Sequence, residues 1–136
     1  MLCGQIRNSI SAWRKLADIS MRAGLAYKIL KYTNLVSAEY EIIEKQRIVL
    51  IHKVTGTKPG DSADIKPGTK DFKDFEGGLI EILLVESNLP QLKMAFMDVI
   101  EAVDQNGGTL TVSDLAALEP FFLTMECNPP NGFDST

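Results

Sequence analysis

The chain has 136 residues, of which 45% are hydrophobic and 24% are charged. This composition is typical of one globular domain with its own core, and it excludes a chain that is disordered throughout. Fourteen Lys and Arg residues stand against eighteen Asp and Glu residues, a formal net charge of −4. Such a balance gives no general attraction to phosphate backbones or anionic lipid, so we expect neither nucleic acid nor a membrane as the partner.

The two cysteines, Cys3 and Cys127, lie near opposite ends of the chain. They form no Cys-x-x-Cys pair, which excludes zinc ribbons and thioredoxin-type redox sites. Free thiols in a reducing compartment are the favoured interpretation, and a disulfide that ties the two ends together stays open. No apolar stretch reaches the ~18–20 residues that span a bilayer, and the first residues lack a signal pattern. We therefore expect a soluble cytoplasmic protein.

The first predicted helix begins near Asn8 or Ser9, two residue types that favour the N-cap position. Apolar residues then recur at helical spacing and form one stripe, at Ile10, Trp13, Leu16 and Ala17. A turn or a kink follows at residues 22–24. A connection this short folds the first helix back antiparallel on the next one.

Residues 25–55 contain neither Gly nor Pro, and they predict one long helix over residues 23–53. Its apolar residues repeat every seven positions, which keeps one seam facing a partner helix. At ~1.5 Å per residue this helix is ~45 Å long, more than a domain of this size covers on one side. We therefore expect part of it to protrude or to pack on another chain. The predicted interface consists of Ile29, Val36, Tyr40, Ile43 and Leu50.

Residues 56–68 contain two Pro-Gly pairs and predict a loop with room for a small hairpin. A third helix is predicted over residues 69–86, with an apolar face that includes Phe72, Phe75 and Leu79. The pair Gly77-Gly78 either weakens this helix or marks a place where it crosses another helix closely. Both interpretations stay open.

Residues 92–96 are apolar at every second position, which is typical of a short strand, and helix is the competing interpretation because apolar residues continue to Val103. A last helix is predicted to begin at a Ser113 cap and to be bent or shortened by Pro120. The whole is expected to be mainly α: a long antiparallel helical hairpin with C-terminal helices and at most one short strand or β-hairpin. One helical domain over residues 1–127 precedes a flexible tail at residues 128–136.

The segment 104–115 resembles an EF-hand calcium loop, in which oxygen ligands alternate around a sharp turn at glycine. Aligning Gly108 with that turn places Asp104, Asn106 and Asp114 at ligand positions. The loop is then one residue short, a third acidic ligand is missing, and it closes with Asp rather than Glu. A Gly-rich turn followed by a helix cap is the favoured interpretation, and a calcium-binding regulatory module is the alternative.

No pattern of catalytic residues emerges from the sequence. His52 is the only histidine, and no nucleophile elbow such as Gly-x-Ser-x-Gly accompanies it. The glycine pairs lack the Lys and the spacing of a phosphate loop. We therefore expect no enzyme, no cofactor and no resident metal. A nucleic-acid-binding helical hairpin is a further alternative, since basic residues cluster near the N-terminus at Arg14, Lys15, Arg22, Lys28 and Lys31.

Five segments, at residues 11–16, 26–31, 44–51, 75–84 and 110–120, together resemble a family of small uncharacterised proteins encoded by tailed bacteriophages and prophages. The chain departs from that pattern in residues 56–68 and at Gly77-Gly78. The resemblance implies a non-enzymatic phage protein, and the long helix, with more apolar seam than one small domain can bury, indicates that it acts through protein–protein contacts or self-association. It would be a virion or assembly component, or an inhibitor of a host system, located in the host cytoplasm or the virion. The family supplies no catalytic residue to carry over.

Overall fold

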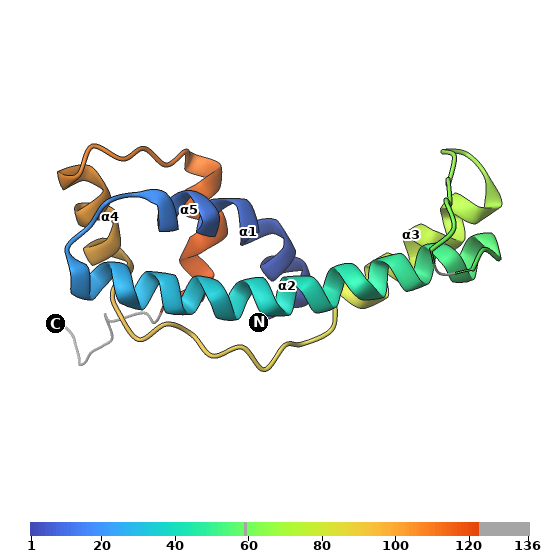
Figure 1. Ribbon diagram of the computed structural model, residues 1–136, viewed down its shortest axis with the longest axis horizontal. Helices are drawn as coiled ribbons and strands as arrows, with labels where there is room; N and C mark the ends of the chain where they lie inside the picture. The colour runs from blue at the N-terminus through green and yellow to red at the C-terminus, as the bar shows by residue number, and fades with distance from the viewer. Residues whose placement is uncertain (59, 123–136) are drawn as a thin grey trace, which may run out of the picture.

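The computed structural model describes residues 1–58 and 60–122. The fold is mainly helical, as predicted (Figure 1). The part of the chain described contains no strand, and two isolated bridges join Leu2 to Glu86 and Leu92 to Phe122. The helices are α1 (Cys3–Asp18), α2 (Ala23–Thr55), α3 (Lys70–Leu83), α4 (Phe96–Gln105), α5 (Val112–Leu118) and the 3-10 helix η1 (Glu119–Phe121).

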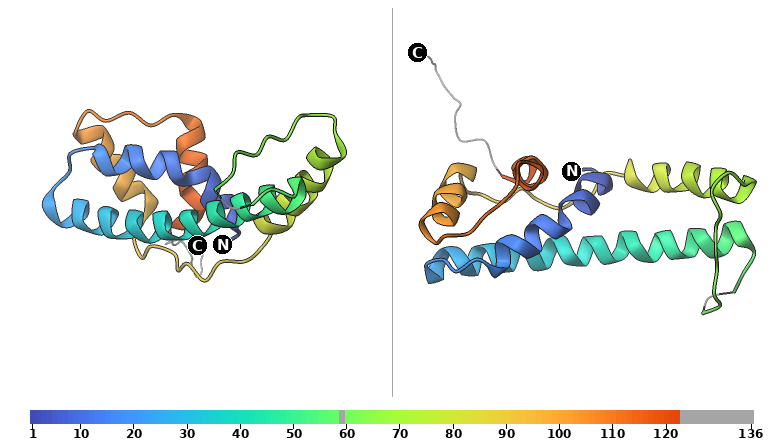
Figure 2. Two further views of the ribbon diagram at one scale, coloured as in Figure 1. Left: turned by 45° about the vertical axis from the view of Figure 1, so that its right-hand side comes forward. Right: turned by 90° about the horizontal axis from the view of Figure 1, so that it is seen from above.

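Helix α2 is the long axis of the molecule (Figure 1). It is continuous over 33 residues, or about 50 Å at 1.5 Å per residue. It ends at Gly56, whose φ of 73° lies in the left-handed region that a glycine adopts at a helix C-terminus. Helix α1 runs back antiparallel along the first half of α2 (Figure 2), so the predicted helical hairpin is confirmed.

Helix α1 begins at Cys3, and the predicted start near Asn8 or Ser9 is wrong. The helix extends further because the chain before it is held by a distant segment: the backbone N–H of Cys3 donates to the carbonyl of Val85. The Gln5 side chain accepts a hydrogen bond from the N–H of Leu2 at 2.9 Å. Ser9 does not cap the helix but is buried inside it, where its hydroxyl donates to the carbonyl of Ile6.

The core is formed by side chains of α1, the first half of α2, α4, α5 and η1, and we call this part the head. Trp13 is at its centre and is fully buried. Its ring stands 5.1 Å from the ring of Tyr32, 5.6 Å from Phe121 and 5.7 Å from Phe122, measured between centroids. Contacts between aromatic rings at these distances stabilise a core beyond the burial of their area.

Helix α3 lies alongside the second half of α2, so α1 and α3 follow one another along the same long helix (Figure 2). The two meet where Gly4 of α1 approaches Leu83 of α3. A Cβ atom added at Gly78 would stand 2.8 Å from a methyl carbon of Leu50 on α2. The glycine pair therefore marks a close approach of α3 to α2, which is the second of the two interpretations. Gly78 is the residue at which the two helices approach.

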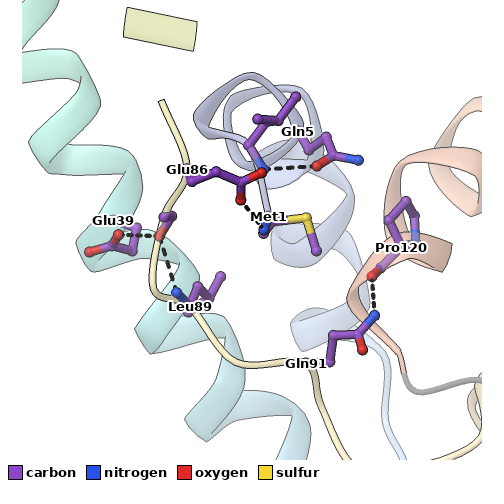
Figure 3. A network of polar contacts seen from close by, with 9 residues as sticks. Met1, Gln5, Glu39, Glu86, Leu89, Gln91 and Pro120 are labelled. Atoms are coloured by element: carbon purple, nitrogen blue, oxygen red, sulfur yellow. Dashed lines mark hydrogen bonds and ion pairs between the residues drawn. The ribbon is translucent and has the colours of Figure 1, made fainter. Parts of the chain in front are cut away.

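Residues 84–95, which we call the strap, return along α2 from α3 to α4 (Figure 1). Polar contacts fix the strap to three elements (Figure 3): Glu86 pairs with the amino group of Met1 at 2.9 Å, and Gln91 donates to the carbonyl of Pro120. Ser87 donates to Glu39 of α2 at 2.5 Å. The strap is thus an extended connection held by side chains rather than by strand pairing.

The possible strand at residues 92–96 is reduced to the single bridge at Leu92, and the helical alternative is the one found from Phe96 onward. In the loop between α2 and α3, the described residues form no hairpin. Helix α5 is capped by Thr111 rather than by the predicted Ser113, and it gives way at Leu118 to η1, which contains Pro120. Cys127 with its possible disulfide, the domain end at residue 127 and the tail at 128–136 lie outside the described residues.

The neighbours Ile42 and Ile43 test the packing of α2, since Ile43 is buried and Ile42 is 56% exposed. Ile43→Asp places an unpaired carboxylate in the core, which costs several kcal/mol. We expect this variant to unfold or to melt far below the original protein in a circular dichroism experiment. Ile42→Asp is the matched control and should retain the melting temperature at low protein concentration. Equal melting of the two variants would contradict the burial described here.

The two adjacent glycines of α3 give a second test. Gly77→Ala should stabilise α3 by about 1 kcal/mol, because alanine favours the helix and a Cβ there meets nothing within 4 Å. Gly78→Ala gains the same helix propensity but must displace the methyl groups of Leu50, so its net stabilisation should be smaller than that of Gly77→Ala. Hydrogen exchange of the amides of residues 70–83 measures both. Equal slowing of exchange in the two variants would show that the helices do not cross at Gly78.

Candidate functional site

The predicted interface residues of α2 face the chain's own helices. Ile29, Val36 and Ile43 are 1%, 0% and 3% exposed. Tyr40 is half-buried with the guanidinium of Arg14 5.6 Å from its ring centroid, and Leu50 is half-buried against Gly78. The seven-residue seam is thus covered by α1 and α3, and a partner would have to bind another face of α2.

The second half of α2 and its neighbour α3 form a region that we call the arm, residues 44–55 together with α3. Among the described residues from 44 to 98, none is buried. The arm is nevertheless rich in apolar side chains, and those of Phe72, Phe75 and Leu79 are only half-covered by α2. Within the described residues the arm consists of two packed helices and has no third layer of the kind that closes the core of the head.

A row of exposed apolar side chains follows α2 on the side away from its core, and we call it the outer row. Its members are Leu35, Ile42 and Val49, which are 45%, 56% and 58% exposed. They are spaced by seven residues and therefore lie on one helix face. Leu35 and Ile42 also line a groove whose other wall is the strap at Val85 and Leu89. The outer row is the most regular apolar feature on the exposed side of α2.

Charged residues flank the outer row on the arm. Lys45 and Lys53 are four residues before and after Val49, so they share its face of α2. On α3, Asp74 and Glu81 are exposed on either side of the glycine pair. Among the ion pairs of the described residues, none includes any of these four side chains. Their charges are therefore available to a partner.

The proposed calcium ligands are not brought together as a set. The Asp114 carboxylate accepts hydrogen bonds from the backbone N–H of Thr111 at 3.0 Å and from Lys15 at 2.9 Å. The amide of Asn106 donates to the carbonyl of Ala102 at 2.7 Å. Within the described residues no group of three or more His, Cys, Asp or Glu side chains could hold a metal ion. Asp114 acts instead as the reciprocal partner of the helix cap at Thr111 and as the anchor of α5 on α1.

The basic residues near the N-terminus are dispersed over the head. Lys15 pairs with Asp114, and Arg14 lies over Tyr40. A cleft between α2 and α4 is lined by Arg22 and Lys28, but Asp98 and Glu101 line it as well. A mixed lining of this kind does not concentrate positive potential as a nucleic-acid groove does.

His52 and Tyr32 are engaged in local hydrogen bonds. The Nδ1 atom of His52 lies 2.7 Å from the hydroxyl of Thr57, just beyond the end of α2. The hydroxyl of Tyr32 donates to the carbonyl of Pro90 in the strap at 2.5 Å, and burial raises the pKa of Tyr32 to about 12. The phenol therefore stays neutral at physiological pH, and its role is to hold the strap against α2.

Comparison with protein families, with curated proteins and with solved structures finds no match to this chain. Among the helices described, none is long and apolar enough to cross a membrane. What the chain can do must therefore be argued from its own surface.

Sequence reasoning missed the outer row, although the sequence contained its signal. Leu35, Ile42 and Val49 have the same seven-residue spacing as the buried seam and precede its members Val36, Ile43 and Leu50 by one position each. Two parallel apolar rows on one helix indicate two contact faces. Sequence reasoning considered only the row that α1 and α3 cover, and it did not treat the adjacent outer row as a separate face.

The cap and ion pair at Asp114 make stability depend on pH. The N–H of Thr111, and next the hydrogen bond from Lys15, hold the pKa of this carboxyl below its ordinary value. A lowered pKa contributes stability that is present above the unfolded-state pKa and is lost as the pH falls through the folded-state pKa. Asp114→Asn should therefore lower the free energy of unfolding in urea at neutral pH and make little difference in acid. If the original protein and the Asp114→Asn variant differed by the same free energy of unfolding at neutral and at acidic pH, the proposed role of the Asp114 carboxylate would be wrong.

Proposed function

We propose that the chain is a non-enzymatic protein of a tailed bacteriophage or prophage and that it works through protein–protein contacts. The resemblance of five segments to small phage proteins supports the phage origin, with a place in the host cytoplasm or in the virion. The arm and the outer row are the proposed contact surface. The role is that of a virion or assembly component or of an inhibitor of a host system.

The observation that carries this proposal is the uncovered arm. From residue 44 to residue 98 the described chain has no buried side chain, whereas Ile48, Val49 and Ile80 expose 46%, 58% and 54% of their surface. Burying one such side chain fully is worth about 1.5–3 kcal/mol. An exposed apolar surface of this kind marks a site of interaction in a soluble protein.

The proposal is preferred to the calcium module and to the nucleic-acid-binding hairpin for physical reasons. A calcium site at Asp114 would have to displace the Lys15 ammonium, which lies 2.9 Å from its carboxylate. A nucleic-acid-binding hairpin would have to overcome the formal net charge of −4 and the carboxylates that line the cleft beside Arg22.

The contact surface is tested with two matched variants, Val49→Asp on the arm and Val112→Asp on the head. Both valines are exposed, at 58% and 84%, so neither change should unfold the chain. Tagged versions are expressed during phage production, cross-linked and purified, and the attached proteins are quantified by mass spectrometry. We expect Val49→Asp to reduce the bound partner by about tenfold, a loss of ~1.4 kcal/mol. Val112→Asp should retain the partner.

Two further results bear on the proposal. Identical sets of bound proteins for both variants, or no bound protein for the original chain, would overturn it. Mass spectrometry of purified particles separates the two roles: a virion component is present in stoichiometric amounts, and a host-directed inhibitor is absent from particles and bound to a bacterial protein.

A further inference from the structure

We propose that the exposed face of α2 binds an amphipathic α-helix of a different protein. This helix would be apolar along its middle and acidic at the end that lies over Lys28 and Lys31. The inference rests on the proposed function, in which the outer row belongs to the contact surface, and it names the kind of partner that this surface fits. The face contains the outer row and extends it toward the start of α2, and we call it the outer seam. Its members are Gly24, Lys28, Lys31, Leu35, Ala38, Ile42, Lys45 and Val49.

The spacing of the outer seam favours a helical partner. Its eight positions follow one another by four and three residues in alternation, which is the pattern of the contact line in a coiled coil. All eight residues are exposed, whereas the buried seam at Ile29, Val36 and Ile43 occupies another face of α2. From Gly24 to Val49 the outer seam is about 38 Å long at 1.5 Å per residue. It is therefore long enough for a partner helix of three heptads.

The strap forms a wall beside the outer seam. One groove lies between α2 at Leu35 and Ile42 and the strap at Val85 and Leu89. A second groove lies between α2 and Leu92 of the strap, and Leu35 lines both grooves. The two grooves are thus adjacent along α2, on the side where the strap runs (Figure 1). A helix on the outer seam would contact apolar side chains of two elements, as helices bound in grooves do.

The second groove lies at the positively charged end of the outer seam. Its α2 wall consists of apolar, aromatic and basic residues, namely Gly24, Tyr27, Lys28, Lys31, Tyr32 and Leu35. Among the described residues no carboxylate lines this groove, and no ion pair within residues 1–58 and 60–122 includes Lys28 or Lys31. A partner carboxylate over these lysines would pair at the edge of an apolar groove, where less water screens the charges. This end of the outer seam therefore selects an acidic end of the partner.

Carboxylates beside the middle of the outer seam fix the register of the partner. Glu39 and Glu86 line the first groove, where they bond to Ser87 and to the amino group of Met1 (Figure 3). Glu41 is exposed on the opposite flank of the outer seam. These negative charges would repel a partner that is acidic throughout. The middle of the partner helix must therefore be apolar, and its carboxylates must gather over the lysines.

The same charges disfavour a second copy of this chain as the partner. In a parallel pair of outer seams every lysine would face its own counterpart. In an antiparallel pair aligned end to end, Lys28 would lie level with Lys45 of the second copy. Neither arrangement brings a carboxylate of one outer seam onto a lysine of the other, since none of the eight members is acidic. A partner of complementary charge is favoured over self-pairing by this repulsion.

The test uses synthetic helical peptides of three heptads with leucine at the a and d positions. Two acidic peptides carry glutamates in the first or in the last heptad, because the partner can run in either direction along α2. Two basic twins carry lysines at the same positions. Binding to the purified full-length chain is measured by fluorescence anisotropy. We expect one acidic peptide to bind at least about tenfold more tightly than its basic twin, with a preference that decreases as salt is added.

The double variant Lys28→Glu/Lys31→Glu should reverse this preference, so that the basic twin binds more tightly. A merely structural role of the two lysines would not give such a reversal. Lys70→Glu/Lys73→Glu is the matched control, since it places the same charge change at exposed positions of α3 and should retain the preference for the acidic peptide. Circular dichroism checks that both double variants keep their helix content.

Equal affinity for acidic and basic peptides, or a preference that Lys28→Glu/Lys31→Glu leaves unchanged, would overturn the proposal. Two other occupants would overturn it as well: a second copy, shown by a dimer in sedimentation equilibrium that Ile42→Asp dissociates, and an anionic membrane, shown by binding to phosphatidylglycerol vesicles where no peptide binds. If no peptide binds but the chain still captures another protein in a Val49-dependent manner, the proposed function stands and this inference fails.

Discussion

The structure depends on one mismatch of length: α2 is longer than the core that it supports. Its first half shares the core around Trp13 with α1, α4, α5 and η1, and among the described residues its second half packs on α3 alone. Two helices in contact bury one stripe of each, whereas a closed core needs a third layer. The exposed apolar residues of the arm and the unpaired charges beside Val49 follow from the absence of that layer among the described residues.

The sequence predicted which faces of α2 are apolar but not what covers them. The repeat of Ile29, Val36 and Ile43 correctly indicates a seam on α2. The length of the helix that carries this seam predicts that part of it protrudes or packs on another chain. The structure covers the seam with α1 and α3 instead. Periodicity is a local property, and the identity of the covering element depends on how the chain returns, which no single segment contains. The long helix and the helical class were predictable because they follow from composition and spacing alone.

The features that the sequence did not predict share a non-local cause. Helix α1 begins at Cys3 because the strap at Val85 and Glu86 satisfies the backbone ahead of it. The role of Gly78 depends on its contact with Leu50, a residue 28 positions earlier in the chain, which the local sequence does not indicate. Caps on neighbouring residues are visible in a sequence, whereas caps supplied from a distant segment are not.

The distribution of buried residues has a consequence for how this protein can vary. Every core side chain of the described residues comes from residues 6–43 or 99–122. The arm is therefore an insertion in the sequence between the two segments that form the core of the head. Removing seven residues from each arm helix near its tip would preserve the facing of the remaining side chains, since seven residues are nearly two full turns. The arm can therefore be lengthened or shortened by whole heptads without changing any residue of the core in the head.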